Sequence, residues 1–332
     1  MPSGSSYGIY GTLNAGPKNA FASLTSIEGD VFLRNGQTTN ITPIGGTLTN
    51  SGNFDIGNGT TVSITGDVVN NNLLTTGENV EGGNNTLNIS GTLTNNRFFF
   101  LTGSGDVANV GNLVNDGTLD IGSTLNISGT LTNNSGGSFV LYGPGGTATI
   151  GSVVNTGLID LEMNLSNGAG LSTPTLNNGG TINVDNLSTF LVGIGVLHGP
   201  ITNYTQLANG TLGEIITPNS FGVINLNGGS ALLAGTLDIL LQGGFNPAVG
   251  KMYQFLIGVA PGQLNGTFGS VLNDVFNGGT EKWLVTYDNA DGYVELVAEN
   301  NGAPVSEPAT VLMLIPGLLG AGYGLRRKLC RP

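Results

Sequence analysis

Three aspartates at equivalent positions are the residues best suited to chemistry in this sequence. Asp55, Asp120 and Asp160 each stand third in a short segment of alternating apolar residues. If such segments stack in successive layers, the three carboxylates form one outward column, which could capture calcium or supply the acid pair of a glycoside hydrolase. We favour a third interpretation, in which the column is a row of solvated polar side chains.

The other candidates for chemistry stand alone. His198 is the only histidine and has no evident orienting partner, so a surface or loop residue is favoured over a general base. The segment from Asp288 to Gly292 lacks the further ligands of a calcium loop and favours a hairpin. Trp283 and Tyr287 could stack on a sugar, although such pairs more often pack a strand face. The sequence therefore predicts no catalytic residue, no metal site and no cofactor, and a protein that is not an enzyme.

Composition favours a packed all-β protein without nucleic-acid partners. Of 332 residues, 57 are glycine and only 9% are charged, which is typical of short strands and tight turns. Before Ser306 the chain has five basic residues against twenty acidic ones, so it lacks the basic clusters that bind phosphate backbones. The only cysteine is Cys330, so the body has no internal disulfide.

A repeat supplies the elements that must position these residues. The pattern Gly-x-aliphatic-x-Asn, or a close variant, begins at 46, 66, 91, 111, 129, 151, 174 and 199, a mean step of about 22 residues. The aliphatic column is Leu48, Val68, Leu93, Leu113, Leu131, Val153, Leu176 and Ile201. The asparagine column is Asn50, Asn70, Asn95, Asn115, Asn133, Asn155, Asn178 and Asn203. We expect the first column to form an interior ridge, and the second to occupy corners, with left-handed backbone angles and amide hydrogen bonds between coils.

The repeat predicts a parallel β-helix, or β-solenoid, with an antiparallel β-sandwich as the alternative. Segments such as Thr86 to Ser90 and Thr124 to Ser128 alternate polar and apolar residues and indicate strands. Longer strands after about Leu226 predict a β-rich cap that covers the last coil. The expected domains are 1–45, an N-terminal cap or first coils; 46–225, the solenoid; 226–300, the cap; 301–308, a linker; 309–325, a membrane helix; and 326–332, a basic tail.

The repeated phrases also carry a family resemblance. Over about 46–298, the Gly-Thr-Leu-Thr-Asn phrases and the segment from Leu264 to Phe268 resemble the passenger regions of autotransporter and haemagglutinin-like surface proteins. The resemblance implies a β-helix architecture and no particular activity.

The C-terminus predicts a membrane span. Ala309 to Leu325 is a run of 17 uncharged, mostly apolar residues, and Arg326, Arg327 and Lys328 follow it directly. The run is long enough to cross a bilayer as a helix, and the basic cluster would remain in the cytoplasm. A buried C-terminal core helix is the alternative. We expect export even though Met1 to Phe21 contains no visible secretion signal, which a trimmed or misassigned start would explain.

The tail also resembles a known sorting signal. Ser306, Glu307 and Pro308, then the apolar run and the basic cluster, resemble the PEP-CTERM tail that exosortases recognise in Gram-negative bacteria. Ser306 stands where that motif has its first proline. The resemblance implies an exosortase-type membrane protease as partner, a transient inner-membrane anchor, and release of the body to the envelope or exterior, often alongside exopolysaccharide production.

Together these features predict an exported structural or adhesive protein of the cell surface or extracellular matrix. Its expected partners are extracellular polysaccharide or other surface proteins. The alternative is a carbohydrate-active enzyme, a polysaccharide lyase or hydrolase, on the same fold.

Overall fold

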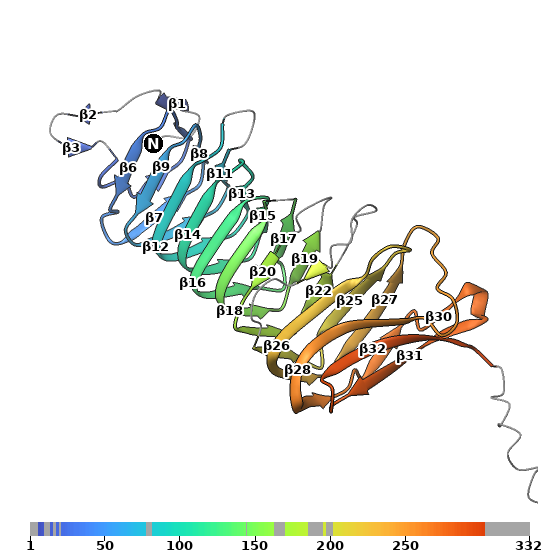
Figure 1. The fold of residues 1–332 in the computed structure, drawn as a ribbon. Coiled ribbons are helices and arrows are strands. Elements are labelled where there is room, and N and C mark those ends of the chain that lie inside the picture. The colour runs from blue at the N-terminus through green and yellow to red at the C-terminus, as the bar shows by residue number, and fades with distance from the viewer. Residues whose placement is uncertain are drawn as a thin grey trace, which may run out of the picture.

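The computed structural model describes residues 6–9, 14–15, 18–19, 21–77, 82–143, 145–162, 170–184, 195–196 and 202–302. These residues are nearly all β, and their only helix is the short 3-10 turn η1 (Asn277–Gly279). Figure 1 shows the strands stacked along one axis into an elongated body, with the N-terminal coils at one end and β30, β31 and β32 at the other.

One long wall of the body is a twelve-stranded parallel sheet, with one short strand from each coil. Its strands are β1 (Ser6–Ile9), β5 (Asp30–Leu33), β8 (Asn53–Ile56), β11 (Leu73–Thr76), β13 (Phe98–Leu101), β15 (Thr118–Ile121), β17 (Ser138–Tyr142), β19 (Leu158–Glu162), β22 (Thr181–Val184), β25 (Thr211–Ile216), β27 (Thr236–Leu241) and β29 (Ser270–Leu272). Neighbouring coils pair residue for residue, for example Leu74 with Phe99 and Phe99 with Leu119.

The second wall is an eighteen-stranded sheet, which we call the long-strand sheet. Its strands are β4 (Ser26–Ile27), β6 (Thr38–Ile41), β7 (Thr47–Asn50), β9 (Thr61–Ile64), β10 (Asp67–Asn70), β12 (Thr86–Asn95), β14 (Val107–Asn115), β16 (Thr124–Asn133), β18 (Thr147–Asn155), β20 (Gly170–Ser172), β21 (Thr175–Asn178), β23 (Gly195–Val196), β24 (Asn203–Gln206), β26 (Gly222–Leu233), β28 (Met252–Gly266), β30 (Val275–Phe276), β31 (Glu281–Asp288) and β32 (Tyr293–Asn300). A separate small pair, β2 (Asn14–Ala15) and β3 (Lys18–Asn19), is antiparallel.

Strict alternation in the sequence produces this architecture. In β12, Leu87, Ile89 and Leu93 are buried, whereas Asn88 and Thr94 face outward. Because successive side chains of a strand point to opposite faces, the inward ones of every coil stack on those of the next and form one continuous core. Burial of each such leucine stabilises the fold by about 1.5 to 3 kcal/mol. The predicted parallel β-solenoid is confirmed, and the sandwich alternative is wrong because the coils pair in parallel.

Glycine stands where the long strands change register. β12 and β14 pair regularly up to Ile89 with Val110, and again from Thr92 with Asn112, with an irregularity between. At this point a Cβ on Gly111 would lie 2.5 Å from the carbonyl oxygen of Gly91, closer than real Cβ contacts. In the central coils the repeat therefore begins with glycine because the coils approach too closely there for a side chain, as they also do at Gly91, Gly129 and Gly151.

Parallel coils continue well beyond residue 225, where the sequence repeat fades. β25, β27 and β29 remain in parallel register, and β26 pairs in parallel with β28. In this part of the chain the antiparallel strands are β30, β31 and β32, and β32 also pairs in antiparallel with β28. Trp283 is buried against Phe276 and Tyr253 in this closing layer, with ring centroids 4.8 and 5.7 Å away. The β-rich cap is thus shorter than the sequence pattern indicates, because coils can stack without keeping the repeat motif.

The tail lies outside the described residues. The sorting motif from Ser306 to Pro308, the predicted membrane helix at 309–325 and the basic cluster from Arg326 to Lys328 all fall within 303–332. Within the described ranges, no helix combines the length and the apolar character needed to cross a membrane.

Candidate functional site

The asparagine column forms a continuous hydrogen-bonded ladder inside the solenoid, which we call the inner ladder. Seven asparagines each donate a hydrogen bond from Nδ2 to the side-chain amide oxygen of the corresponding residue in the next coil, at 2.8 to 3.0 Å. The ladder consists of Asn50, Asn70, Asn95, Asn115, Asn133, Asn155 and Asn178, and it ends on Gln206. All of these residues are buried.

The inner ladder uses nearly all of its hydrogen-bonding capacity. The second amide hydrogen of Asn95 is donated to the carbonyl oxygen of Thr118 at 2.9 Å, and Asn133 does the same to Leu158. Oδ1 of Asn95 accepts from Asn70. Since buried amides left unpaired are costly, this saturation is what permits a polar row within an apolar core. The inner ladder is structural, and only its two ends, Oδ1 of Asn50 and Nε2 of Gln206, have no hydrogen-bond partner in the described part of the chain.

Two details of the asparagine prediction are wrong. The backbones of the ladder asparagines do not have positive φ, which Asn35 and Asn58 adopt instead; the ladder residues end extended strands with their side chains directed inward. Asn203 is exposed and outside the ladder, because Thr175 pairs with Asn203 and Asn178 with Gln206. The strand has slipped by three residues relative to the motif, and Gln206 supplies the amide.

Apolar residues occupy the ladder position in the coils beyond both ends. Ile27 pairs with Asn50 at the N-terminal end, and Oδ1 of Asn50 accepts no hydrogen bond within the described part of the chain. At the other end, the register that pairs Thr205 with Leu232 brings Leu233 beside Gln206. The ladder is therefore confined to the central coils.

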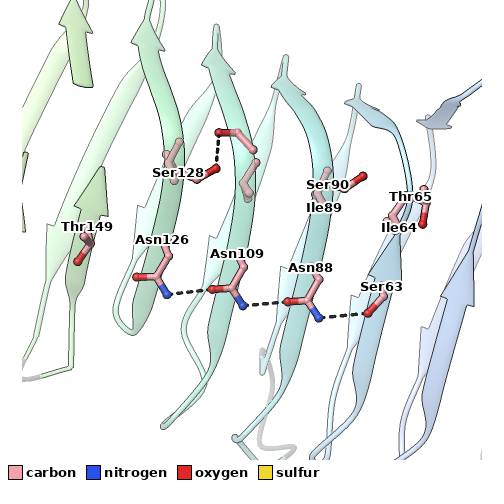
Figure 2. A pocket seen from close by; sticks show the side chains of 13 residues that line it. Ser63, Ile64, Thr65, Asn88, Ile89, Ser90, Asn109, Asn126, Ser128 and Thr149 are labelled. Atoms are coloured by element: carbon pink, nitrogen blue, oxygen red, sulfur yellow. Dashed lines mark hydrogen bonds between the residues drawn. The ribbon is translucent and has the colours of Figure 1, made fainter. Parts of the chain in front are cut away.

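A groove of about 570 Å³ runs across five coils on the outside of the long-strand sheet. It follows the line where β12, β14 and β16 change register, and its residues come from β9, β12, β14, β16 and β18 and the bends after them. It is lined by Ser63, Ile64, Thr65, Asn88, Ile89, Ser90, Asn109, Val110, Gly111, Asn126, Ile127, Ser128 and Thr149. Figure 2 shows these residues arranged in rows that cross the strands.

One row is a second, partly exposed set of amides, which we call the outer amide row. Nδ2 of Asn126 donates to Oδ1 of Asn109 at 2.9 Å, and Nδ2 of Asn109 donates to Oδ1 of Asn88 at 2.8 Å. Asn88 completes the row by donating to Oγ of Ser63 at 3.1 Å, as the dashed lines in Figure 2 show. The row exists because Asn88, Asn109 and Asn126 occupy one register column of the sheet.

Exposed hydroxyl groups form the other side of the groove. Thr65, Ser90 and Ser128 lie at the bends, where the strands change direction around the glycines. Ser90 Oγ accepts from the backbone of Gly66 at 3.0 Å, and Ser128 Oγ lies 3.4 Å from the carbonyl oxygen of Gly111. Every lining residue is uncharged, so the groove offers amides, hydroxyls and hydrocarbon but no acid, base or cation.

The aspartates predicted as a column do share a register position, but they are not neighbours. Thr75 and Phe100 stand between Asp55 and Asp120, and Val140 stands between Asp120 and Asp160. At about 4.8 Å per coil, their backbones are roughly 14 and 10 Å apart. Asp55 is also buried and forms a 2.8 Å ion pair with Arg34. No group of three or more possible metal-ligating side chains occurs in the described ranges.

Of the remaining predicted candidates, Asp288 and Tyr287 make hydrogen bonds within the C-terminal part of the fold. His198 lies outside the described residues. Oδ1 of Asp288 accepts from the backbones of Ala290 and Asp291, which closes the predicted hairpin between β31 and β32. The hydroxyl of Tyr287 accepts from the backbone of Phe268 at 3.2 Å, within the cap.

Sequence reasoning missed two features. The outer amide row was visible as the asparagine in Thr86 to Ser90 and in Thr124 to Ser128, but only the register aligns those segments with Asn109. An aromatic pair, Phe98 and Phe100, lies partly exposed on the twelve-stranded sheet with ring centroids 5.6 Å apart. The guanidinium of Arg97 lies 5.1 Å from the centre of the Phe98 ring.

The chain matches no protein-family model, no curated protein and no solved structure.

Proposed function

We propose that this protein is an exported structural or adhesive component of the cell surface or extracellular matrix, with the solenoid acting as a rigid spacer. The observation that carries the proposal is the fully buried inner ladder. It joins coil to coil by side-chain hydrogen bonds, in addition to the backbone ladders, over seven successive steps. A body whose central coils are each tied to the next in this way suits a load-bearing or presenting role.

The outward surface supports the same role. The groove is built from neutral amide and hydroxyl groups, and the body carries few basic residues against many acidic ones. An acid–base enzyme needs ionisable groups within reach of one another and of the substrate, whereas these surfaces suit polar contact with a matrix.

Export and sorting rest on the tail. Ser306, Glu307 and Pro308, followed by the apolar run and the basic cluster, resemble an exosortase signal. In the proposal, the tail holds the chain in the inner membrane until an exosortase-type protease releases the body to the envelope or exterior.

Surface labelling and a turnover assay test the proposal together. In intact cells that carry an exosortase, a membrane-impermeant biotin reagent should label the body of the full chain supplied with a secretion signal, with a cytoplasmic protein as the negative control. Purified protein should release no sugar from a panel of neutral and acidic polysaccharides. Turnover on any of them would favour the alternative, a carbohydrate-active enzyme on a β-helix, and a body protected from the reagent would contradict export.

A further inference from the structure

We propose that the groove binds a neutral polysaccharide, with the polymer chain lying along the solenoid axis across the outer amide row. This inference rests on the proposed function, because a surface protein meets such polymers, and it names the ligand class of the adhesive face.

The amides of the outer amide row have donor hydrogens to spare, unlike the asparagines of the inner ladder. Nδ2 of Asn109 makes one hydrogen bond, to Asn88, and Oδ1 accepts one, from Asn126. An amide has two donor hydrogens and two lone pairs, so one of each remains at Asn109 within the described part of the chain. The Asn95 amide of the inner ladder, by comparison, donates both hydrogens to protein acceptors. The partly exposed row thus offers a free donor beside a free acceptor.

A sugar hydroxyl is the group that such a pair fits. Each hydroxyl both donates and accepts, so two hydroxyls on one sugar can pair with the free hydrogen and the free lone pair of a single amide. The hydroxyls of Ser90 and Ser128 on the other side of the groove can exchange roles in the same way. Ile89 and Val110 form the floor of the groove between the rows but are almost fully buried, so the amide and hydroxyl groups make the contacts with the polymer.

Charge selects neutral polymers over acidic ones. The groove contains no lysine or arginine to pair with a carboxylate or sulfate, and the chain has a formal net charge of -12. An anionic chain would be repelled by the body and would lose its hydration without compensation. Nucleic acid and acidic polysaccharide are thereby disfavoured, and a neutral polymer is not.

The spacing of the outer amide row is similar to the repeat of a polysaccharide chain. Ser63, Asn88, Asn109, Asn126 and Thr149 come from successive coils at about 4.8 Å spacing, so they span about 19 Å. A sugar residue in an extended chain has similar length, so consecutive sugars can meet consecutive coils. Several weak contacts held on one rigid surface then act together, which raises the overall affinity.

The test is affinity gel electrophoresis of the purified full chain. Dextran, a soluble β-glucan and a galactomannan serve as neutral probes, and alginate serves as the acidic one. The wild-type protein should be retarded by at least one neutral polymer and not by alginate, and adding salt to about 0.5 M should leave the retardation unchanged. The triple variant Asn88→Thr, Asn109→Thr and Asn126→Thr should bind about tenfold more weakly or worse. Threonine already occupies this column at Thr149, so the variant should fold.

Matched variants make the result decisive. Asn71→Thr, Asn96→Thr and Asn134→Thr change three asparagines outside the groove and should bind as the wild type does. Should the groove triple variant unfold, the single variant Asn109→Thr replaces it, with its fold checked by circular dichroism. The inference is overturned by an absence of binding to all three neutral polymers, by a folded groove variant that binds normally, or by loss of binding in Phe98→Ala with Phe100→Ala instead. None of these results bears on surface labelling, so the proposed function is judged separately.

Discussion

The side-chain amide of Asn95 donates a 2.8 Å hydrogen bond to Oδ1 of Asn115, and both residues are fully buried. The next residue along the chain, Asn96, is exposed and bonds to Asn71 at the surface. Adjacent asparagines of one turn therefore have opposite environments, which allows the inner ladder to be tested within a single dipeptide.

Asn95→Ala should lower the free energy of unfolding by about 3 kcal/mol. The substitution removes the donor to Oδ1 of Asn115 and to the carbonyl of Thr118. It also takes one acceptor from Nδ2 of Asn70, which keeps its hydrogen bond to the carbonyl of Phe98. Asn96→Ala, as the control, should cost about 0.5 kcal/mol or less. Urea denaturation followed by circular dichroism measures both values, and equal losses would contradict a ladder that stabilises the fold.

Gly111→Ala should destabilise the protein by about 2 kcal/mol, through close approach rather than backbone strain. A Cβ there would lie 2.5 and 2.7 Å from the carbonyl oxygens of Gly91 and Ser90. The control is Gly136→Ala, where the nearest atom would be 3.5 Å away and the change should stay within about 0.5 kcal/mol. Thermal denaturation compares the two, and a Gly111 variant as stable as the Gly136 variant would argue against the tight stacking of coils.

Glu214 should make stability depend on pH. The side chain is buried, Oε1 has no hydrogen-bond partner within the described residues, and burial raises the pKa of the carboxyl well above its usual range, partly offset by a hydrogen bond from the backbone of Gly222. The folded state therefore keeps a proton that the unfolded state loses as pH rises above about 4.5, and stability falls with rising pH over that range.

Glu214→Gln removes that dependence because the amide does not ionise. Its free energy of unfolding should exceed that of the wild type by on the order of 1 kcal/mol or more at about pH 8, and the difference should shrink toward about pH 4. Urea denaturation at both pH values measures the effect, with the exposed Glu28→Gln as the control. A difference that is the same at both values would contradict a raised pKa for the carboxyl of Glu214 in the folded protein.

The interior of the central coils could be predicted from sequence because burial there depends on spacing alone. Leu113 and Asn115 recur at a fixed distance after glycine, and they lie buried in the core and the inner ladder. The same spacing is misleading at Asn203. It completes the motif, but the register that pairs Leu176 with Tyr204 moves the ladder position to Gln206. A sequence motif shows only which residue types occur at which spacing, whereas the register between neighbouring strands depends on how the whole coil packs.

The groove could not be predicted because it is a property of several coils at once. Asn88 and Asn126 appear in identical five-residue segments, but Asn109 stands between them in a segment of different sequence. Likewise, Asp55 and Asp120 share a column that Thr75 and Phe100 interrupt, because outward positions are free to vary while inward ones are not. The outward-facing residues therefore follow the repeat less regularly than the inward-facing residues that form the core.

Changing Glu307 and Pro308 together to alanine should trap the chain at the inner membrane. The apolar run and the basic cluster would remain, whereas the proposed recognition motif would be lost. Membrane fractionation detects the trapped form, with Asn300→Ala as the control upstream of the motif. Release of the double variant at the wild-type rate would show that these two residues are not recognised.

The central claim, export and sorting through the tail, is tested most directly by the mass of the C-terminus. The full chain, supplied with a secretion signal and produced in a Gram-negative host with an exosortase, is fractionated and its C-terminal peptide identified by mass spectrometry. We predict a C-terminus near Ser306 to Pro308, on a body located outside the inner membrane. An intact chain ending at Pro332 and found soluble in the cytoplasm would contradict the account.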